Sequence, residues 1–193
     1  MGKSLYQTSQ SNPFDNSKTI LGICCPQNYF YFYIMKIVLF QPQIPQNTGN
    51  VVRTCKVTGS ELVLVKPLGF STSDKALKRA GLDYWDGTPV TLIDDLESFV
   101  LKERAPFYFF SSHAKKSYTS ISYTPKDLLI FGSETTGLPA SFHEKWSDLF
   151  FTLPMIKNSR CLNLANTASI VLYEAWRQQG FFGWDHDCNL KGI

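Results

Sequence analysis

The chain has 193 residues, of which 44% are hydrophobic and 18% charged, a balance typical of a folded globular protein and not of a disordered one. Its formal net charge of +3 is compatible with an RNA or nucleotide ligand but far below that of a protein that coats a polyanion. No apolar run reaches the roughly 18–20 residues that span a bilayer, which excludes an integral membrane protein. We therefore expect no membrane among its partners.

Residues 1–34 differ in composition from the rest of the chain. They are polar up to Thr19, then carry an apolar stretch that Pro26 interrupts, and then an aromatic run from Tyr29 to Tyr33. A signal peptide would show a basic start, an apolar centre and a small-residue cleavage site, and this order is missing. Met35 opens directly into a strand-like run, so we interpret residues 1–34 as an upstream extension that is not part of the fold.

From Met35 onward, short apolar runs alternate with helical patterns. The predicted buried strands are 36–40, 61–65, 107–110, 128–131 and 149–153. The predicted helices are 50–58, 74–80, 94–103 and 163–179. Strands that alternate with helices predict an α/β fold with a mainly parallel sheet, here a single domain over residues 35–184 followed by a tail, 185–193.

Three loops after predicted strands carry the residues that point to a function. A parallel sheet places its ligand at the carboxyl ends of the strands. Segments 41–53, 132–139 and 154–164 follow such ends and are rich in Gly, Pro, Asn and Ser, which turn the chain and leave backbone N–H and C=O groups available to a ligand. Among their charged residues are Arg53, a cation in a predicted helix, and Glu134, their one carboxylate.

Familiar nucleotide-binding and catalytic motifs are missing. Gly132-x-x-x-x-Gly137 lacks the Lys-Ser/Thr of a phosphate-binding P-loop, and neither GxGxxG after a strand nor GxSxG occurs. The histidines (His113, His143 and His186) are scattered and no His, Cys or carboxylate cluster has zinc spacing, so we expect no metal. Five cysteines without regular spacing form no disulfide framework, which indicates the reducing cytoplasm.

Each candidate residue also has a purely structural interpretation. Arg53, expected near the start of the first helix, could be a solvated or ion-paired surface residue, and Asn50 could be a helix cap. Glu134 could bond only the N–H groups of its own loop, and Cys161 could be a small buried hydrophobic residue. No single residue therefore decides the function.

The three loops together resemble one family. The matching strings are Asn47-Thr48-Gly49-Asn50-x-x-Arg53, Phe131-Gly132-x-Glu134-x-x-Gly137-Leu138-Pro139, and Leu153-Pro154-Met155 with Arg160-x-Leu162-Asn163-Leu164. They are similar to the SPOUT class of RNA ribose methyltransferases, and within it to the small tRNA (cytidine/uridine-2'-O) methyltransferases that act at the wobble position. Arg79-Ala80-Gly81-Leu82-Asp83-Tyr84 and Tyr173-Glu174-Ala175-Trp176-Arg177-Gln178 are further matches. The resemblance covers about residues 35–184.

This resemblance implies a C-terminal trefoil knot, a homodimer and the cofactor S-adenosyl-L-methionine. The residues that it implies for cofactor binding are Phe110, Gly132, Leu153, Cys161, Glu134 and Asn163, the last two as groups that hold the loops or the methionine moiety. Glycine at 132 would allow close approach of the backbone to a ligand. Phe110 and Leu153 would supply apolar walls, although core packing explains them equally well. The family usually has Ser in place of Cys161, a change that is harmless if the contact there is made by the backbone.

The implied reaction is 2'-O-methylation of the wobble nucleotide in the tRNA anticodon stem-loop. Arg53 would bind phosphate or the 2'-hydroxyl and assist its deprotonation. Because an arginine stays protonated at neutral pH, orientation and electrostatic stabilisation are the physical account that we prefer. The candidate RNA contacts are basic residues and neighbouring aromatic rings, namely Lys75, Lys78, Arg79, Lys115, Lys116, Lys157, Arg160, Tyr84, Trp85 and Tyr118.

Two alternatives remain open at this point. One is a ribosomal RNA 2'-O-methyltransferase of the same class. The other is a knotted module that binds RNA without catalysis, in which Cys161 marks the loss of activity, although intact Arg53, Glu134 and Asn163 argue against it. The last predicted helix, with Tyr173 and Trp176, would form part of the dimer interface or of the core.

Overall fold

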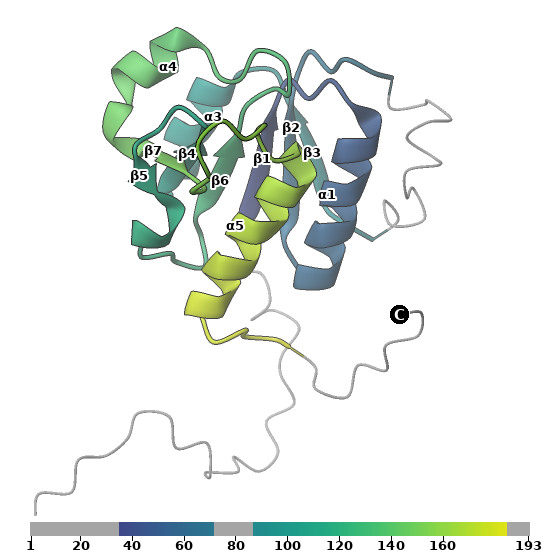
Figure 1. Cartoon of the computed structure of the whole chain (residues 1–193). Helices are drawn as coiled ribbons and strands as arrows, with labels where there is room; N and C mark the ends of the chain where they lie inside the picture. Colours follow the sequence, from purple (N-terminus) through teal and green to yellow (C-terminus); the bar gives the residue numbers. More distant parts are fainter. Residues whose placement is uncertain (1–34, 72–86, 185–193) are drawn as a thin grey trace, which may run out of the picture.

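The computed structural model describes residues 35–71 and 87–184, in which seven strands form one parallel sheet (Figure 1). The order across the sheet is β3-β2-β1-β6-β4-β7-β5, and every recorded strand pair is parallel. The strands are β1 (Lys36–Phe40), β2 (Glu61–Val65), β3 (Val90–Ile93), β4 (Phe107–Phe110), β5 (Lys116–Ser117), β6 (Leu128–Phe131) and β7 (Phe150–Thr152). The expected α/β class with a mainly parallel sheet is confirmed.

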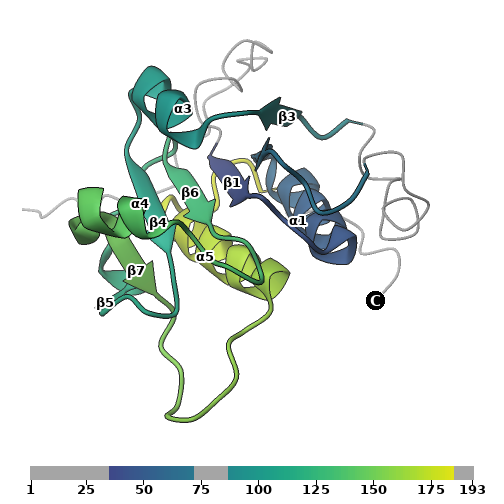
Figure 2. The same cartoon turned by 90° about the horizontal axis from the view of Figure 1, so that it is seen from above.

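Helices cover both faces of the sheet (Figures 1 and 2). Helices α1 (Pro45–Thr58) and α5 (Leu164–Gln178) pack on one face, where they share a core cluster with Ile37, Leu39 and Leu129. The short helices α3 (Leu96–Glu103) and α4 (Ala140–Lys145) lie on the other face. None of the helices in residues 35–71 and 87–184 is long and apolar enough to cross a bilayer.

The first helix begins earlier than the sequence pattern indicates. It starts at Pro45 instead of residue 50, because proline is tolerated in the first turn, where its missing N–H needs no partner. Arg53 therefore lies in the middle of α1, and Asn50 lies inside the helix, so the expectation of Asn50 as a cap is wrong. The residue at the N-cap position is Ile44.

The other predicted elements compare closely with the structure. The strands predicted at 36–40, 61–65, 107–110 and 128–131 are confirmed, and the fifth is shorter, Phe150–Thr152. The last helix begins one residue later than predicted because Asn163 caps it: the Asn163 side-chain oxygen accepts hydrogen bonds from the backbone N–H groups of Ala165 and Asn166. The helix predicted at 74–80 lies outside the described residues.

The order of the strands positions the functional loops. β6 lies between β1 and β4, and β7 lies between β4 and β5. Each of these two strands therefore inserts between strands that precede it in the sequence. The carboxyl ends of β1, β4, β6 and β7 therefore meet at one edge, although the segments that follow them are far apart in sequence. The trefoil knot stays a prediction.

Candidate functional site

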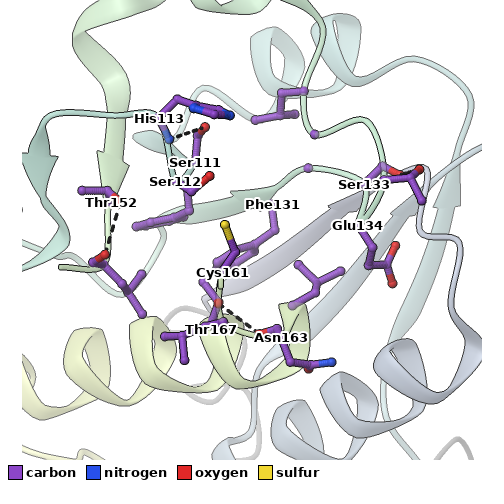
Figure 3. A pocket seen from close by; sticks show the side chains of 18 of the residues that line it. Ser111, Ser112, His113, Phe131, Ser133, Glu134, Thr152, Cys161, Asn163 and Thr167 are labelled. Carbon is purple, nitrogen blue, oxygen red and sulfur yellow. Dashed lines mark hydrogen bonds between the residues drawn. The ribbon is translucent and has the colours of Figure 1, made fainter. Parts of the chain in front are cut away.

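A cavity of about 560 Å³ opens at the carboxyl ends of β4, β6 and β7, beside the first turns of α1 and α5 (Figure 3). Its walls come from four parts of the chain, which we call together the strand-end cavity. The residues that line it include Asn47, Phe110, Ser111, His113, Gly132, Glu134, Leu138, His143, Thr152, Leu153, Met155, Cys161, Leu162, Asn163 and Thr167.

All six residues implied for cofactor binding lie in the wall of this cavity, and the implied catalytic residue does not. Phe110, Gly132, Leu153, Cys161, Glu134 and Asn163 line it. Arg53 is exposed on α1, six residues after Asn47, which is about 9 Å farther along the helix axis at 1.5 Å per residue.

Glu134 ties the loop after β6 to the start of α1. One carboxylate oxygen, Oε2, accepts a hydrogen bond from the backbone N–H of Gln43 at 2.8 Å. The other, Oε1, accepts one from the backbone N–H of Ile44 at 3.3 Å and one from the side-chain amide of Asn47 at 2.9 Å. The expectation that Glu134 might serve only its own loop is wrong, because its partners belong to the segment after β1.

Asn47 extends this connection to α5. Its Oδ1 accepts a hydrogen bond of 2.8 Å from the side-chain amide of Asn163, the residue that caps α5. Asn47 is 5% exposed, so its amide has little access to water and depends on these partners. The sequence analysis included Asn47 in a motif but assigned it no role. Its fixed spacing from Arg53 was the one feature of the sequence that pointed to a function for Asn47.

The glycine at 132 is required by its own loop. A Cβ at this position would lie 2.5 Å from the carbonyl carbon of Gly137 and 2.8 Å from its Cα. The loop is closed here by paired backbone hydrogen bonds between Ser133 and Gly137, of 3.1 and 2.9 Å. The contacts of its own loop thus already require a glycine at 132, and close approach of its backbone to a ligand stays a prediction.

The apolar walls belong to the core and to the cavity at once. Phe110 and Leu153 are 6% and 8% exposed and are members of the core cluster under α1 and α5. Phe110 stacks on Phe131 with ring centroids 4.9 Å apart. The core interpretation of these two residues is confirmed, and their contact with a cofactor stays a prediction. The walls that they form are rigid because they are part of the core.

Cys161 is exposed and its sulfur points into the strand-end cavity (Figure 3). The alternative of a small buried hydrophobic residue is wrong for Cys161, because it lies in a loop that runs over the surface. The interpretation as a small buried hydrophobic residue does fit Cys55 on α1, which is fully buried. Burial raises the pKa of the Cys55 thiol to about 12.

Two histidines in the cavity wall were not predicted as site residues. His143 of α4 stacks on Phe150 with ring centroids 3.9 Å apart, and His113 follows β4. Desolvation, and secondly the neighbouring His113, lowers the pKa of His143. Thirty residues separate the two histidines, and nothing in the sequence pattern indicates that they share a wall.

The predicted RNA contacts divide into three groups. Lys116 forms an ion pair of 3.2 Å with Asp148, and Tyr118 packs against the core. Lys115, Lys157 and Arg160 are exposed in loops beside the strand-end cavity. Lys75, Lys78, Arg79, Tyr84 and Trp85 lie outside the described residues. Within the described part of the chain, no group of three or more potential metal ligands is present.

Comparison with known proteins gives consistent matches over most of the chain. The model of the SpoU rRNA Methylase family matches residues 34–173. The tRNA (cytidine(34)-2'-O)-methyltransferase of Escherichia coli (strain K12) is 42% identical over 152 residues, which cover 78% of this chain and 97% of that protein. Its counterpart in Saccharophagus degradans is 44% identical over 153 residues, covering 78% of this chain and 99% of the relative.

Solved structures agree with these matches. One described as "Structural insights into the 2-OH methylation of C/U34 on tRNA" is 38% identical, with a TM-score of 0.72, and the match covers 77% of this chain and 98% of the other. The SpoU methyltransferase AviRb from Streptomyces viridochromogenes, solved with the cofactor AdoMet, is 22% identical with a TM-score of 0.68. That match covers 76% of this chain and 58% of AviRb, and at this identity it shows a shared fold.

Proposed function

Because the chain belongs to the SpoU rRNA Methylase family, we propose that it transfers the methyl group of S-adenosyl-L-methionine to the 2'-hydroxyl of nucleotide 34, the wobble position, of a tRNA. One observation carries this proposal: two relatives that bear the name of this activity are 42% and 44% identical over 97% and 99% of their length. We place the reaction in the cytoplasm, where the tRNA substrate is found.

The strand-end cavity suits the proposed cofactor. Its volume of about 560 Å³ lies in the range of small-molecule sites, and it combines apolar walls with a few polar groups. Phe110 and Leu153 would hold the apolar surface of the nucleoside, and backbone groups at Gly132 and Cys161 would bind its polar edges. When bound, S-adenosyl-L-methionine supplies an electrophilic methyl group on a sulfonium centre.

The hydrogen-bonded residues keep this cavity in shape. Both oxygens of Glu134 and the side-chain amides of Asn47 and Asn163 already have partners within the protein. They therefore act by fixing the three loops relative to one another, which preorganises the cavity for a ligand and lowers the entropy cost of binding.

Arg53 is the residue that we propose for the RNA side of the reaction. In the proposed reaction the cofactor would supply a methyl group to the ribose 2'-oxygen, sulfur would keep the electron pair of the broken carbon–sulfur bond, and the hydroxyl proton would be released to solvent. A guanidinium can bind a neighbouring phosphate through two parallel N–H groups, which would orient the ribose and stabilise the developing negative charge on its oxygen. Its exposed position on α1 is compatible with contact to a large ligand.

We also propose that the protein is a homodimer and that α1 and α5 form its interface. The two helices lie side by side, joined by a hydrogen bond of 2.9 Å between the hydroxyls of Thr54 and Ser169. Their outer surface carries Val57, Ile170 and Tyr173, which are 58%, 40% and 44% exposed. An apolar surface of this kind is typical of a protein contact, and a dimer would pool two moderately basic surfaces for one tRNA.

Methyl transfer to purified RNA tests the proposed function. The protein is incubated with labelled S-adenosyl-L-methionine and, separately, with tRNA and ribosomal RNA from cells that lack the enzyme. Label in the tRNA fraction, on an anticodon-loop ribose, is the expected result. Label in ribosomal RNA alone would favour the other substrate of this class, and cofactor binding without transfer to either RNA would contradict the proposed activity.

A further inference from the structure

The loop that joins β7 to α5 projects away from the rest of the fold (Figure 2). Three of its residues, Met155, Cys161 and Leu162, line the strand-end cavity. Every residue from Pro154 to Asn163 in the loop is exposed. The loop is nevertheless held in shape. Leu153 at one end is buried, Asn163 at the other end is bonded to Asn47, and between them the backbone N–H and the hydroxyl of Ser159 both donate to the carbonyl of Ile156.

This loop has an inner and an outer side. Met155, Cys161 and Leu162 line the strand-end cavity, whereas Ile156, Lys157 and Arg160 do not. Ile156 is 83% exposed, more than any other large hydrophobic residue in the described part of the chain. The inner side is therefore occupied by the cofactor site, and the outer side presents one aliphatic and two cationic side chains to the surroundings.

The two cations on the outer side are available for a ligand. Lys116 of β5 and Lys145 of α4 form ion pairs with Asp148 and Glu97. For Lys157 and Arg160, by contrast, no side-chain hydrogen bond or ion pair occurs within residues 35–71 and 87–184. Segment 154–163 contains no acidic residue, so it carries two positive charges that nothing in the loop balances.

We propose that the outer side of this loop binds the RNA strand next to the methylated ribose, with Lys157 and Arg160 on phosphates and Ile156 against a neighbouring nucleoside. The inference rests on the proposed function, since it assigns the RNA contact of the same site. Phosphates complement the unbalanced charge, and an exposed aliphatic side chain covers the apolar face of an unstacked nucleoside at little cost in ordering.

A second copy of this chain fits the same surface less well. In a two-fold symmetric dimer both copies use the same surface, so this loop, placed at the symmetry axis, would meet the two unbalanced cations of the other copy. The exposed apolar residues of α1 and α5 supply a different surface for the dimer. A polyanion is therefore the occupant that the charge of this loop favours.

The test replaces the two cations together, Lys157→Gln with Arg160→Gln, in the full chain. A matched control, Lys102→Gln with Arg104→Gln, removes the same charge from exposed residues at the C-terminal end of α3, which do not line the strand-end cavity. We expect the KM and Kd for tRNA to rise about tenfold or more in the loop variant, with kcat and the cofactor Kd within about twofold of the wild type. The slope of log Kd against log salt should fall by about 1.4, because each contact to a single-strand phosphate contributes about 0.7.

Ile156→Ser provides a second variant that leaves the charge unchanged. We expect it to raise the KM for tRNA several-fold without changing the oligomeric state. Dissociation of a dimer by Ile156→Ser would overturn the inference, because the loop would then be a protein contact.

An unchanged KM and salt slope in the Lys157→Gln, Arg160→Gln variant of an active enzyme would overturn the inference as well, and leave the proposed function standing. A wild-type protein that methylates no RNA would instead overturn the proposed function, and with it this inference.

Discussion

The side-chain amide of Asn163 donates a hydrogen bond of 2.8 Å to Oδ1 of Asn47, and the amide of Asn47 donates one of 2.9 Å to Glu134. The three residues are separated by 116 and 87 positions in the sequence. They join the start of α5, the first turn of α1 and the loop after β6. The wall of the strand-end cavity is thus held together by side chains from three loops.

Replacement of Asn47 by Ala should weaken cofactor binding as well as the fold. It leaves the amide of Asn163 without its acceptor and Oε1 of Glu134 with only the backbone N–H of Ile44, at a part-buried site, a loss of about 1–3 kcal/mol. If half of that loss lowers the stability of the ligand-binding conformation of the cavity, the cofactor Kd rises about two- to tenfold. Calorimetric titration with S-adenosyl-L-methionine, together with thermal unfolding, measures both effects. Asn50→Ala, exposed on the same helix, is the control, and a wild-type cofactor Kd for Asn47→Ala would refute the role of the network.

Gly132→Ala should disrupt the same cavity from the loop after β6. The added Cβ would lie 2.5 Å from the carbonyl carbon of Gly137, so the loop must move. We expect the melting temperature to fall and cofactor binding to be lost. Gly59→Ala serves as the control, since its Cβ meets nothing within 4 Å and only the left-handed backbone (φ +70°) opposes it, at a cost of about 1 kcal/mol. Equal cofactor affinities for the two variants would contradict this account of Gly132.

Cys161 should react with a thiol reagent, and the cofactor should protect it. Its side chain is exposed at the cavity wall, whereas the buried thiol of Cys55, with a pKa of about 12, stays protonated and unreactive at pH 8. The measurement uses a chain in which Cys24, Cys25 and Cys188 are Ser, labelled with and without S-adenosyl-L-methionine. Labelling of Cys161 at the same rate with saturating cofactor would place the ligand elsewhere. A Cys161→Ser variant with unchanged cofactor Kd and turnover would support a contact through the backbone.

Arg53→Ala should separate binding from chemistry. Because Arg53 does not line the strand-end cavity, the cofactor Kd should stay within about twofold, while methyl transfer falls about a hundredfold or more through loss of electrostatic stabilisation. Arg53→Lys keeps the charge without the two-pronged geometry and should recover part of the rate. Full activity of Arg53→Ala would remove Arg53 from the reaction.

A shortened chain that begins at Met35 should fold and methylate RNA like the full chain. This follows from the interpretation of residues 1–34 as an extension outside the domain 35–184. Thermal unfolding and methyl transfer, with both chains compared side by side, measure the difference. A lower melting temperature or lost activity of the shortened chain would show that the extension contributes to the fold.

The sequence predicted the sheet well because its buried strands are continuous apolar runs with clear ends, as in 36–40 and 128–131. It missed β3 and β5 because their side chains are half-exposed or exposed, which weakens the apolar signal. It also placed the start of α1 five residues late, because Pro45, Asn47 and Gly49 are typical of a loop, and only packing against the sheet makes that turn helical.

The site was predictable where the residues lie in ordered motifs, and not where the fold alone brings residues together. Six candidates line one cavity, as the resemblance implied. The partners of Glu134 and the shared wall of His113 and His143 depend on strand order, which a single sequence does not contain. The reason for Gly132 likewise became visible only with the backbone of Gly137 in place.

The most direct test of the central claim uses a tRNA in which only nucleotide 34 lacks its 2'-hydroxyl. We expect that the unmodified tRNA accepts a methyl group, that a 2'-deoxy sugar at nucleotide 34 abolishes acceptance, and that the same change two nucleotides upstream leaves it intact. Methylation of the tRNA that is deoxy at nucleotide 34, at the wild-type level, would contradict the claim.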